Sequence, residues 1–210
     1  ELGGVHGPVS QLVVADTKYA GAIEVALGGA LQNIVVENEY SARDAIQKLK
    51  GSGQGRATFL PLTAIKGRTL EEKGLELEDG YIGVASELVH YEDRYQSVVQ
   101  SLLGRIVVMQ DMDSAISVAK RRSNRFKIVT LDGQVINAGG SMTGGSMSQK
   151  AGILSRRSEI DRLASQAQKV RGQLEQMEPQ FAQVQGAIRQ LDTEIEGLHE
   201  ELRKASEQRI

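Results

Sequence analysis

The sequence predicts an α+β fold, α/β-like in its local order, in which two pseudo-symmetric αβ lobes precede one long coiled-coil helix. Two patterns carry this prediction: a degenerate repeat within residues 1–150 and an unbroken heptad series over residues 160–205. The globular part is long enough for one well-buried core. We expect the first lobe at about 4–68, a connector at about 69–80, the second lobe at about 81–149 and the helix over 151–210.

The repeat shows the same order of elements twice: helix, apolar strand, second helix, second strand. In the first copy these are expected at 19–27, 34–36, around 42–49 and at 58–62; in the second they are expected at 95–103, 106–108, around 115–119 and at 127–131. Tyr19 matches Tyr95, Gly28 matches Gly104, and the pair Ala45–Ile46 matches Ala115–Ile116. A single α/β sheet with accidental similarity is the alternative.

A glycine-rich segment follows the second copy. It begins after an Asp132–Gly133 pair between two apolar runs, which is a signal for a two-residue hairpin. Glycine allows another backbone to approach closely, so we expect an interface formed by strand addition. A flexible linker to the helix is the alternative. The residues expected at this interface are Gly139, Gly140, Met142, Thr143, Gly144 and Gly145.

The heptad series predicts a coiled-coil helix, because apolar residues recur every three and then four positions. One such helix cannot bury its own seam, and the sequence contains no second helix of that length, so another helix must cover it. An antiparallel partner fits at least as well as a parallel one. Pro179 faces away from the seam and is expected to kink or loosen the helix locally. The seam residues are Ile160, Leu163, Ala167, Val170, Leu174, Met177, Phe181, Val184, Ile188, Leu191, Ile195, Leu198, Leu202 and Ala205.

The net charge of -2 conceals one acidic and one basic segment. Acids crowd residues 71–93, and bases crowd residues 120–127 and 150–157. The two basic clusters predict a phosphate-binding patch, and the scarcity of aromatic residues predicts contacts to nucleic acid that are independent of sequence. A solvated helix face is the alternative. The expected DNA-binding residues are Lys120, Arg121, Arg122, Arg125, Lys127, Lys150, Arg156 and Arg157.

Signals for catalysis are absent from the sequence. It contains no phosphate-binding loop motif, no nucleophile elbow, no cysteine and no pair of histidines at metal-ligand spacing. We therefore expect no catalytic residue, no metal and no cofactor. No apolar run reaches the length of a membrane span and no signal peptide precedes the first lobe, so we expect a cytoplasmic protein without a membrane partner.

An ordered set of segments across the globular part resembles the hinge domain of the structural maintenance of chromosomes (SMC) proteins. The similarity is to the bacterial homodimeric form with a piece of its outgoing coiled-coil arm. The segments are GVHGPV at 4–9, ALGGALQNIVV at 26–36, GRATFLPL at 55–62, LGR at 103–105, VTLDG at 129–133 and GGSMTGG at 139–145.

The resemblance implies a ring-shaped homodimer in which the glycine-rich edge of one lobe meets the other lobe of the partner. Gly139, Gly140, Gly144 and Gly145 would then be interface residues, together with Gly28 and Gly29. It also implies a role in chromosome condensation and segregation, association with the nucleoid, and DNA contacts near the junction of hinge and arm. A coiled-coil adaptor, whose α/β domain binds a protein or small ligand, is the alternative.

The resemblance also says where the missing parts belong. ATP hydrolysis is a property of head domains that this sequence lacks, and kleisin-type regulatory subunits bind elsewhere in such full-length proteins. The incoming arm helix, expected before Gly4, is reduced to three residues here. The natural partner of the heptad seam is therefore expected before Glu1 on the full-length chain.

Overall fold

The computed structural model describes residues 3–53, 55–145 and 152–207, except for the side chains at 155, 157–159, 161 and 205–207. It divides into a compact unit, Glu1–Ile160, and a second unit, Asp161–Ile210. The first unit holds both lobes and the start of the long helix, and the second holds the rest of that helix. Each unit is described by itself.

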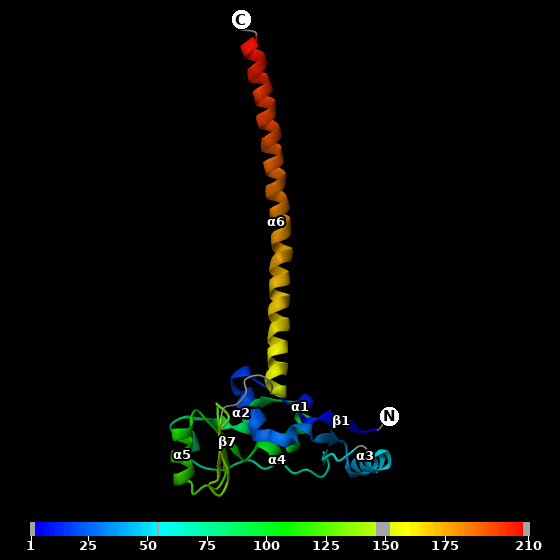
Figure 1. Ribbon diagram of the computed structural model, residues 1–210, viewed down its shortest axis with the longest axis vertical. Coiled ribbons are helices and arrows are strands. Elements are labelled where there is room, and N and C mark those ends of the chain that lie inside the picture. The colour runs from blue at the N-terminus through cyan, green and yellow to red at the C-terminus, as the bar shows by residue number, and fades with distance from the viewer. Residues whose placement is uncertain (1–2, 54, 146–151, 208–210) are drawn as a thin grey trace. The chain divides into compact units, whose positions relative to one another are not determined.

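The globular unit contains the predicted elements in the predicted order (Figure 1). The first lobe comprises β1 (Val5–Pro8), α1 (Val9–Leu12), β2 (Val14–Ala15), α2 (Thr17–Leu27), η1 (Gly28–Gln32), β3 (Ile34–Val36), α3 (Glu39–Ser52) and β4 (Phe59–Pro61). After η2 (Leu75–Leu77), the second lobe comprises β5 (Tyr81–Val84), η3 (Ala85–Glu87), β6 (Val89–His90), η4 (Asp93–Tyr95), α4 (Gln96–Leu103), β7 (Ile106–Met109), α5 (Met112–Arg121), β8 (Lys127–Thr130), β9 (Val135–Ile136) and β10 (Met142–Thr143).

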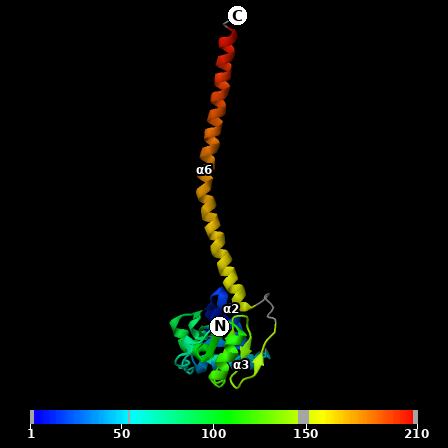
Figure 2. The same cartoon turned by 90° about the vertical axis from the view of Figure 1, so that its left-hand side faces the viewer.

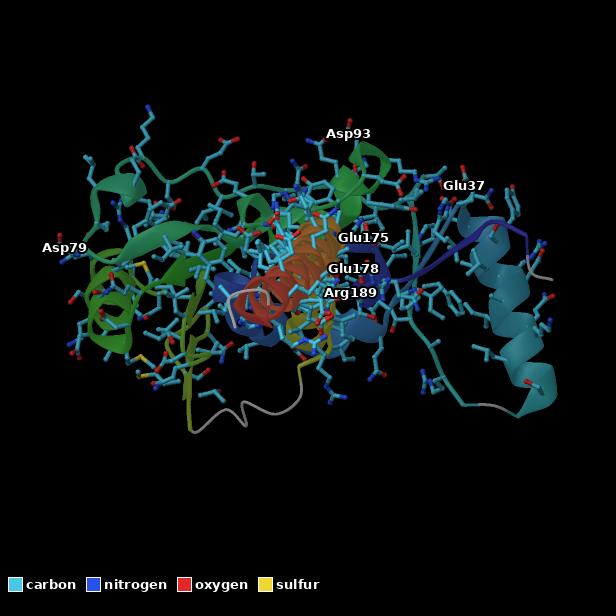
Figure 3. All side chains as sticks on the ribbon, turned by 90° about the horizontal axis from the view of Figure 1, so that it is seen from above. Glu37, Asp79, Asp93, Glu175, Glu178 and Arg189 are labelled. Carbon is cyan, nitrogen blue, oxygen red and sulfur yellow. The ribbon has the colours of Figure 1, made fainter. Side chains whose placement is uncertain are left out.

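Sheet topology confirms the two pseudo-symmetric lobes. In the first lobe β1 is antiparallel to β3, which is parallel to β4; in the second, β5 is antiparallel to β7, which is parallel to β8. The second sheet then continues through β9 and β10, giving the order β10-β9-β8-β7-β5. The matching strands β2 and β6 pair with each other between the lobes. Figure 3 shows Glu37, beside α3, and Asp79, beside α5, on opposite sides of the globular part.

Helix capping fixes the alignment of the two copies. The Asn38 side chain accepts hydrogen bonds from the backbone at the start of α3, and the Asp111 side chain does the same at the start of α5. Matching these caps aligns Ala45–Ile46 with Val118–Ala119. The expected match of Ala45–Ile46 with Ala115–Ile116 was therefore wrong by one helical turn, because Ala42, one turn before Ala45, is the residue that corresponds to Ala115.

The hairpin between β8 and β9 is confirmed, but its loop is longer than expected. The Thr130 amide donates to the Gln134 carbonyl at 2.9 Å, and the Gly133 amide donates to the Thr130 carbonyl at 2.9 Å. Residues 131–133 therefore form a three-residue loop, in which Gly133 has a φ of 82°. A glycine with positive φ at the end of a three-residue loop is a common hairpin solution.

The core is shared unequally between the lobes. One cluster spans both of them, with Ile23 of α2 and Leu103 of α4 fully buried, and it includes Leu154 from the first turn of the long helix. A second cluster lies between α5 and its sheet. Helix α3, the counterpart of α5, buries only Ala42 and Ala45, and Ile46 remains 51% exposed.

The long helix α6 (Ile153–Glu207) contains 55 residues (Figure 2). Helical structure continues through Pro179, so the expected local weakness does not interrupt it. The apolar seam is exposed: every large apolar side chain described on it, from Ile160 to Leu202, is at least 50% exposed. Within the described residues, no helix is both long and apolar enough to cross a membrane.

Candidate dimer edge and basic surface

The described part of the glycine-rich segment forms a second hairpin. Strand β10 pairs with β9, with Met142 opposite Ile136 and Thr143 opposite Val135. The loop is closed by the Asn137 amide, which donates to the Ser141 carbonyl at 2.8 Å. Strand β10 is the last strand of its sheet among the described residues, and both its side chains are exposed, Met142 by 53%.

Three of the four glycines of this hairpin are required by the local backbone, and the fourth is not. Gly139, Gly140 and Gly145 have φ values of 89°, 94° and 148°, which L-residues rarely adopt, so the local backbone itself demands glycine. Gly144 does not have a positive φ, and a Cβ there would meet only the flexible Gln134 side chain, at 3.4 Å. The fold of this chain therefore does not require a glycine at position 144.

Gly28 and Gly29 lie elsewhere, where α2 passes into η1. Gly28 has a φ of 51°, and added Cβ atoms at either position would meet nothing within 4 Å. Both are exposed in the first lobe. The structure therefore does not bring them into the hairpin, and any common interface would involve two different surfaces.

The basic end of α5 faces the acidic connector. Glu78 accepts a short hydrogen bond from Arg121 and another from Arg122 at 3.1 Å. Glu72 lies 3.0 Å from Arg125. The hydrogen bonds from the two guanidinium groups lower the pKa of Glu78, Arg121 having the larger effect. The two oppositely charged segments of the sequence thus form ion pairs with each other.

The other predicted DNA-binding residues occupy different surroundings. Lys120 is exposed, and among the described residues its side chain has no ion pair. Lys127 donates to the Ala26 carbonyl at 3.1 Å, and burial lowers its pKa. Arg156 is exposed on α6, Lys150 lies outside the described residues, and so does the side chain of Arg157. The predicted set is therefore not gathered into one patch by the described part of the chain.

Sequence reasoning missed the attachment of α6 to the globular unit. The Glu24 carboxylate on α2 accepts a hydrogen bond from the Ile153 amide at 2.8 Å, which satisfies a donor in the first turn of α6. Gly152 leaves room for that carboxylate, and Leu154 is only 1% exposed. Lys127 also contacts α2, two residues further along. The start of α6 and Lys127 therefore lie beside the same turn of α2.

A bridge between the lobes was also missed. The two ring nitrogens of His6 on β1 lie 3.2 Å from the Tyr95 hydroxyl and 2.8 Å from the Glu37 carboxylate. Tyr95 is only 2% exposed and belongs to the core of both lobes. The partners of His6 are 89 and 31 positions away in the sequence, so no local pattern indicates this bridge. Across the described residues, no three acidic or histidine side chains cluster in a way that would hold a metal ion.

Comparisons with known proteins agree with this architecture. The family model for the flexible hinge domain of SMC proteins matches residues 2–119. The chromosome partition protein Smc of Bacillus subtilis (strain 168) is 47% identical over 149 residues, which cover 70% of this chain and 13% of that protein. The protein of the same name from Halothermothrix orenii is 46% identical over 148 residues, covering 70% and 12%. The chain thus spans about an eighth of the length of these curated relatives.

Two solved structures show the same fold. The crystal structure of an asymmetric dimer of the Geobacillus stearothermophilus SMC hinge domain matches with a TM-score of 0.78 and 42% identity, over 84% of this chain and 72% of that one. The Pyrococcus furiosus SMC hinge domain matches with a TM-score of 0.60 and 32% identity, over 71% and 77%. With two pseudo-symmetric lobes, an attached helix and these matches, the chain belongs to the SMC hinge-domain family.

Proposed function

We propose that this chain is the homodimerisation hinge of a chromosome partition protein and closes a ring at the far end of its coiled-coil arms. The observation that carries the proposal is a pair of sheet edges on one chain. Within the described residues, β4 is one edge strand of the first sheet and β10 is one edge strand of the second. An exposed strand edge is a template for pairing with another chain. The relative from Geobacillus stearothermophilus, crystallised as a dimer, supports the same association.

In the proposed dimer the β10 edge of each chain meets the first lobe of the other. Because each chain then gives one edge and receives one, two contacts close a ring of two. Gly139, Gly140, Gly144 and Gly145 lie on the donating side with Met142 and Thr143, and Gly28 and Gly29 stay in the proposal on the receiving lobe. The proposal keeps the limits expected from the sequence: the first lobe at about 4–68, the connector at about 69–80, the second lobe at about 81–149 and the arm at 151–210.

The rest of the proposal concerns the longer protein. The exposed seam of α6 is covered by an arm helix that precedes this segment, running antiparallel to α6. ATP hydrolysis and kleisin-type subunits belong to other domains of that protein, and the whole acts at the nucleoid in chromosome condensation and segregation. The name of the Bacillus subtilis relative supports the last point.

A measurement of mass tests the dimer against the adaptor alternative. The truncated chain should end at residue 160 rather than 150, because Leu154 belongs to the core and Glu24 caps the first turn of α6. Sedimentation equilibrium of residues 1–160 should give a dimer at micromolar concentration. A monomer would contradict the hinge proposal and favour an adaptor whose helix alone drives association.

We also propose weak, sequence-independent DNA binding by the basic residues near the junction of hinge and arm. Ion pairs with Glu72 and Glu78 reduce the charge that Arg121, Arg122 and Arg125 present, so affinity should be low and should fall steeply with salt. Reversing the charge at Lys120, Arg121 and Arg122 should reduce binding in fluorescence anisotropy at low salt.

The cleanest single change is Lys120→Glu, since it breaks no ion pair of the described residues. Its matched control is Lys50→Glu, which makes the same change of charge at the exposed end of α3. We expect Lys120→Glu to weaken binding more than Lys50→Glu. Equal DNA affinities for both variants would show that binding depends only on the net charge of the chain, and α5 would then not be part of the DNA-binding surface.

A further inference from the structure

A polar pocket lies in the second lobe, between η3 and the start of α4. Its volume is about 450 Å³, which is within the range of small-molecule sites. The side chains around it offer carboxylate, hydroxyl and amide groups, and neither β4 nor β10 contributes to it. No lysine or arginine of the described residues lines it. The polar groups that the argument uses belong to Thr69, Ser86, Glu87, Asp93, Gln96 and Gln100.

Both walls of the pocket are anchored in the hydrophobic core. On one side, η3 and β6 are held by Ala85 and Val89, which are buried in the cluster that spans both lobes. On the other side, Tyr95 is only 2% exposed and lies between the lining residues Asp93 and Gln96. The pocket is therefore formed before any ligand binds, so little conformational entropy is lost when one enters.

Ser86 forms a polar spot in a largely buried part of this pocket. The residue is 7% exposed, and among the described residues its hydroxyl has no hydrogen-bond partner. Within the same part of the chain, no side-chain nitrogen or oxygen is both shielded from solvent and unpaired. The Ser86 hydroxyl is therefore accessible, and the pocket that it lines is the space that it faces. Since buried polar groups are normally hydrogen-bonded, this hydroxyl marks a place for a ligand.

Two carboxylates give the pocket a negative charge. Neither Glu87 nor Asp93 forms an ion pair with a described residue. Burial raises the pKa of the neighbouring Tyr81, and the negative charge of Glu87 raises it further. Arg94, the basic residue of η4, is held by Glu92 at 2.8 Å. The uncompensated charge of the pocket therefore favours a cation.

The arrangement of the acidic groups selects the kind of cation. Across the described residues, no three acidic or histidine side chains lie close enough together to hold a metal ion, although Glu87, His90 and Asp93 line one pocket. A ligand that neutralises both carboxylates must therefore carry positive charges at separate points. An alkyl chain with two or more ammonium groups has this form. The side chains of Val89 and Tyr91 offer it an apolar surface and an aromatic ring.

We propose that this pocket is a binding site for a linear polyamine. One ammonium group donates to the Ser86 hydroxyl and pairs with Glu87, and a second ammonium group pairs with Asp93. Each ammonium has three N–H donors, so the side-chain oxygens of Gln96 and Gln100 accept further hydrogen bonds. The site does not depend on the proposed homodimer, because its lining includes neither of the sheet edges assigned to that contact.

Isothermal titration calorimetry with spermidine, on the full chain at moderate salt, tests the site. We expect saturable binding with one site per chain. Ser86→Ala should weaken binding at least about fivefold, and so should the pair Glu87→Gln with Asp93→Asn. The matched control is the pair Glu71→Gln with Asp79→Asn, which makes the same change of charge at exposed residues outside the pocket. Figure 3 shows Asp79 and Asp93 on different sides of the globular part.

Four outcomes would overturn the inference. They are the absence of saturable binding, an unchanged affinity in Ser86→Ala, an equal loss in the pocket pair and the control pair, and equal affinities for spermidine and n-butylamine. We expect n-butylamine, which has one ammonium group, to bind about tenfold more weakly or worse. Thermal melting of each variant confirms that it is folded.

A further titration identifies the source of the ammonium groups. A short peptide with two lysines and blocked ends offers the same chemistry from a protein segment. Tighter binding of spermidine than of this peptide supports a free polyamine as the ligand. Tighter binding of the peptide would overturn that assignment and give the pocket to a basic segment of a protein.

Discussion

The two lobes begin alike and end differently. In each sheet the first strand is antiparallel to its neighbour, β1 to β3 and β5 to β7, and a helix then leads to a parallel strand, β4 or β8. Among the described residues, the first sheet gains no further strand after β4, whereas the second adds β9 and β10. The second lobe consequently buries a cluster of its own under α5, including Phe126 at 4% exposure. At the corresponding place the first lobe has Ala57 and an unfilled groove.

The difference teaches that the hairpin after β8 has two separable tasks. Strand β9 completes the lobe to which it belongs, because Ile136 fills the space under α5. Strand β10 adds no buried side chain to its own lobe. A strand that the lobe does not need for its core is available to complete a similar lobe that lacks one.

The largest effect should come from removing a buried side chain from the core of the second lobe. Phe126→Ala should lower the free energy of unfolding by about 3–5 kcal/mol, because it leaves a cavity in a closed core. Ile46→Ala, on the exposed face of α3, should cost about 0.5 kcal/mol or less. Urea unfolding followed by circular dichroism at one protein concentration measures both. Similar losses for both variants would mean that the two helix faces are equally packed.

The next effect concerns the glycines whose conformation does not demand glycine. Gly144→Leu should weaken self-association about tenfold or more, because the added side chain would crowd the side chain opposite it on the joined strand. The same replacement at Gly29 tests how far the receiving surface extends on the first lobe, and we expect a smaller loss there. Analytical ultracentrifugation measures the loss of self-association in each variant, and thermal melting confirms that both variants are folded. A dimer unaffected by Gly144→Leu would place the contact elsewhere.

A smaller effect should come from the ion pairs, which the first lobe does not share. Glu72→Gln and Glu78→Gln together should raise DNA affinity and steepen its dependence on salt by about one unit of slope for each additional phosphate contact. The reason is that Arg121, Arg122 and Arg125 lose their acidic partners. Anisotropy titrations over a series of salt concentrations measure the slope. An unchanged slope would show that these arginines do not meet phosphate.

The smallest effect distinguishes the two helix caps by pH. The hydrogen bond from the Ser114 amide lowers the pKa of Asp111, so its contribution to stability is present above the ordinary pKa of 3.8 and is lost as pH falls below it. The Asn38 cap does not titrate. Asp111→Ala should therefore lower the melting temperature at pH 7 and lower it less near pH 3, whereas the penalty of Asn38→Ala should not follow a titration at that residue. If the loss of melting temperature changed with pH in the same way for both variants, the proposed role of the Asp111 charge in capping α5 would be wrong.

Local patterns predicted most of the fold. The periodicity around Tyr19 and Tyr95 identified the paired helices, and the heptads identified α6. What failed depended on contacts between distant residues. The ion pair of Glu78 with Arg121 joins residues 43 positions apart, so a run of bases looked like one free patch. The acidic segment could have indicated these ion pairs, because a block of acidic residues can neutralise a block of basic residues in the same domain. The Glu24 cap on α6 spans 129 positions and left no mark in the sequence beyond Gly152.

In the proposed dimer, the β4 and β10 edges also determine how many chains can join. A chain with one donating and one accepting edge is, in the language of polymer chemistry, a bifunctional monomer, which can either cyclise or grow end to end. Once one contact has formed, the second forms within the same pair at an effective concentration of the order of millimolar, so cyclisation prevails in dilute solution. In the proposed ring, the same valence separates opening from dissociation, because one contact can break while the other still holds the two chains together.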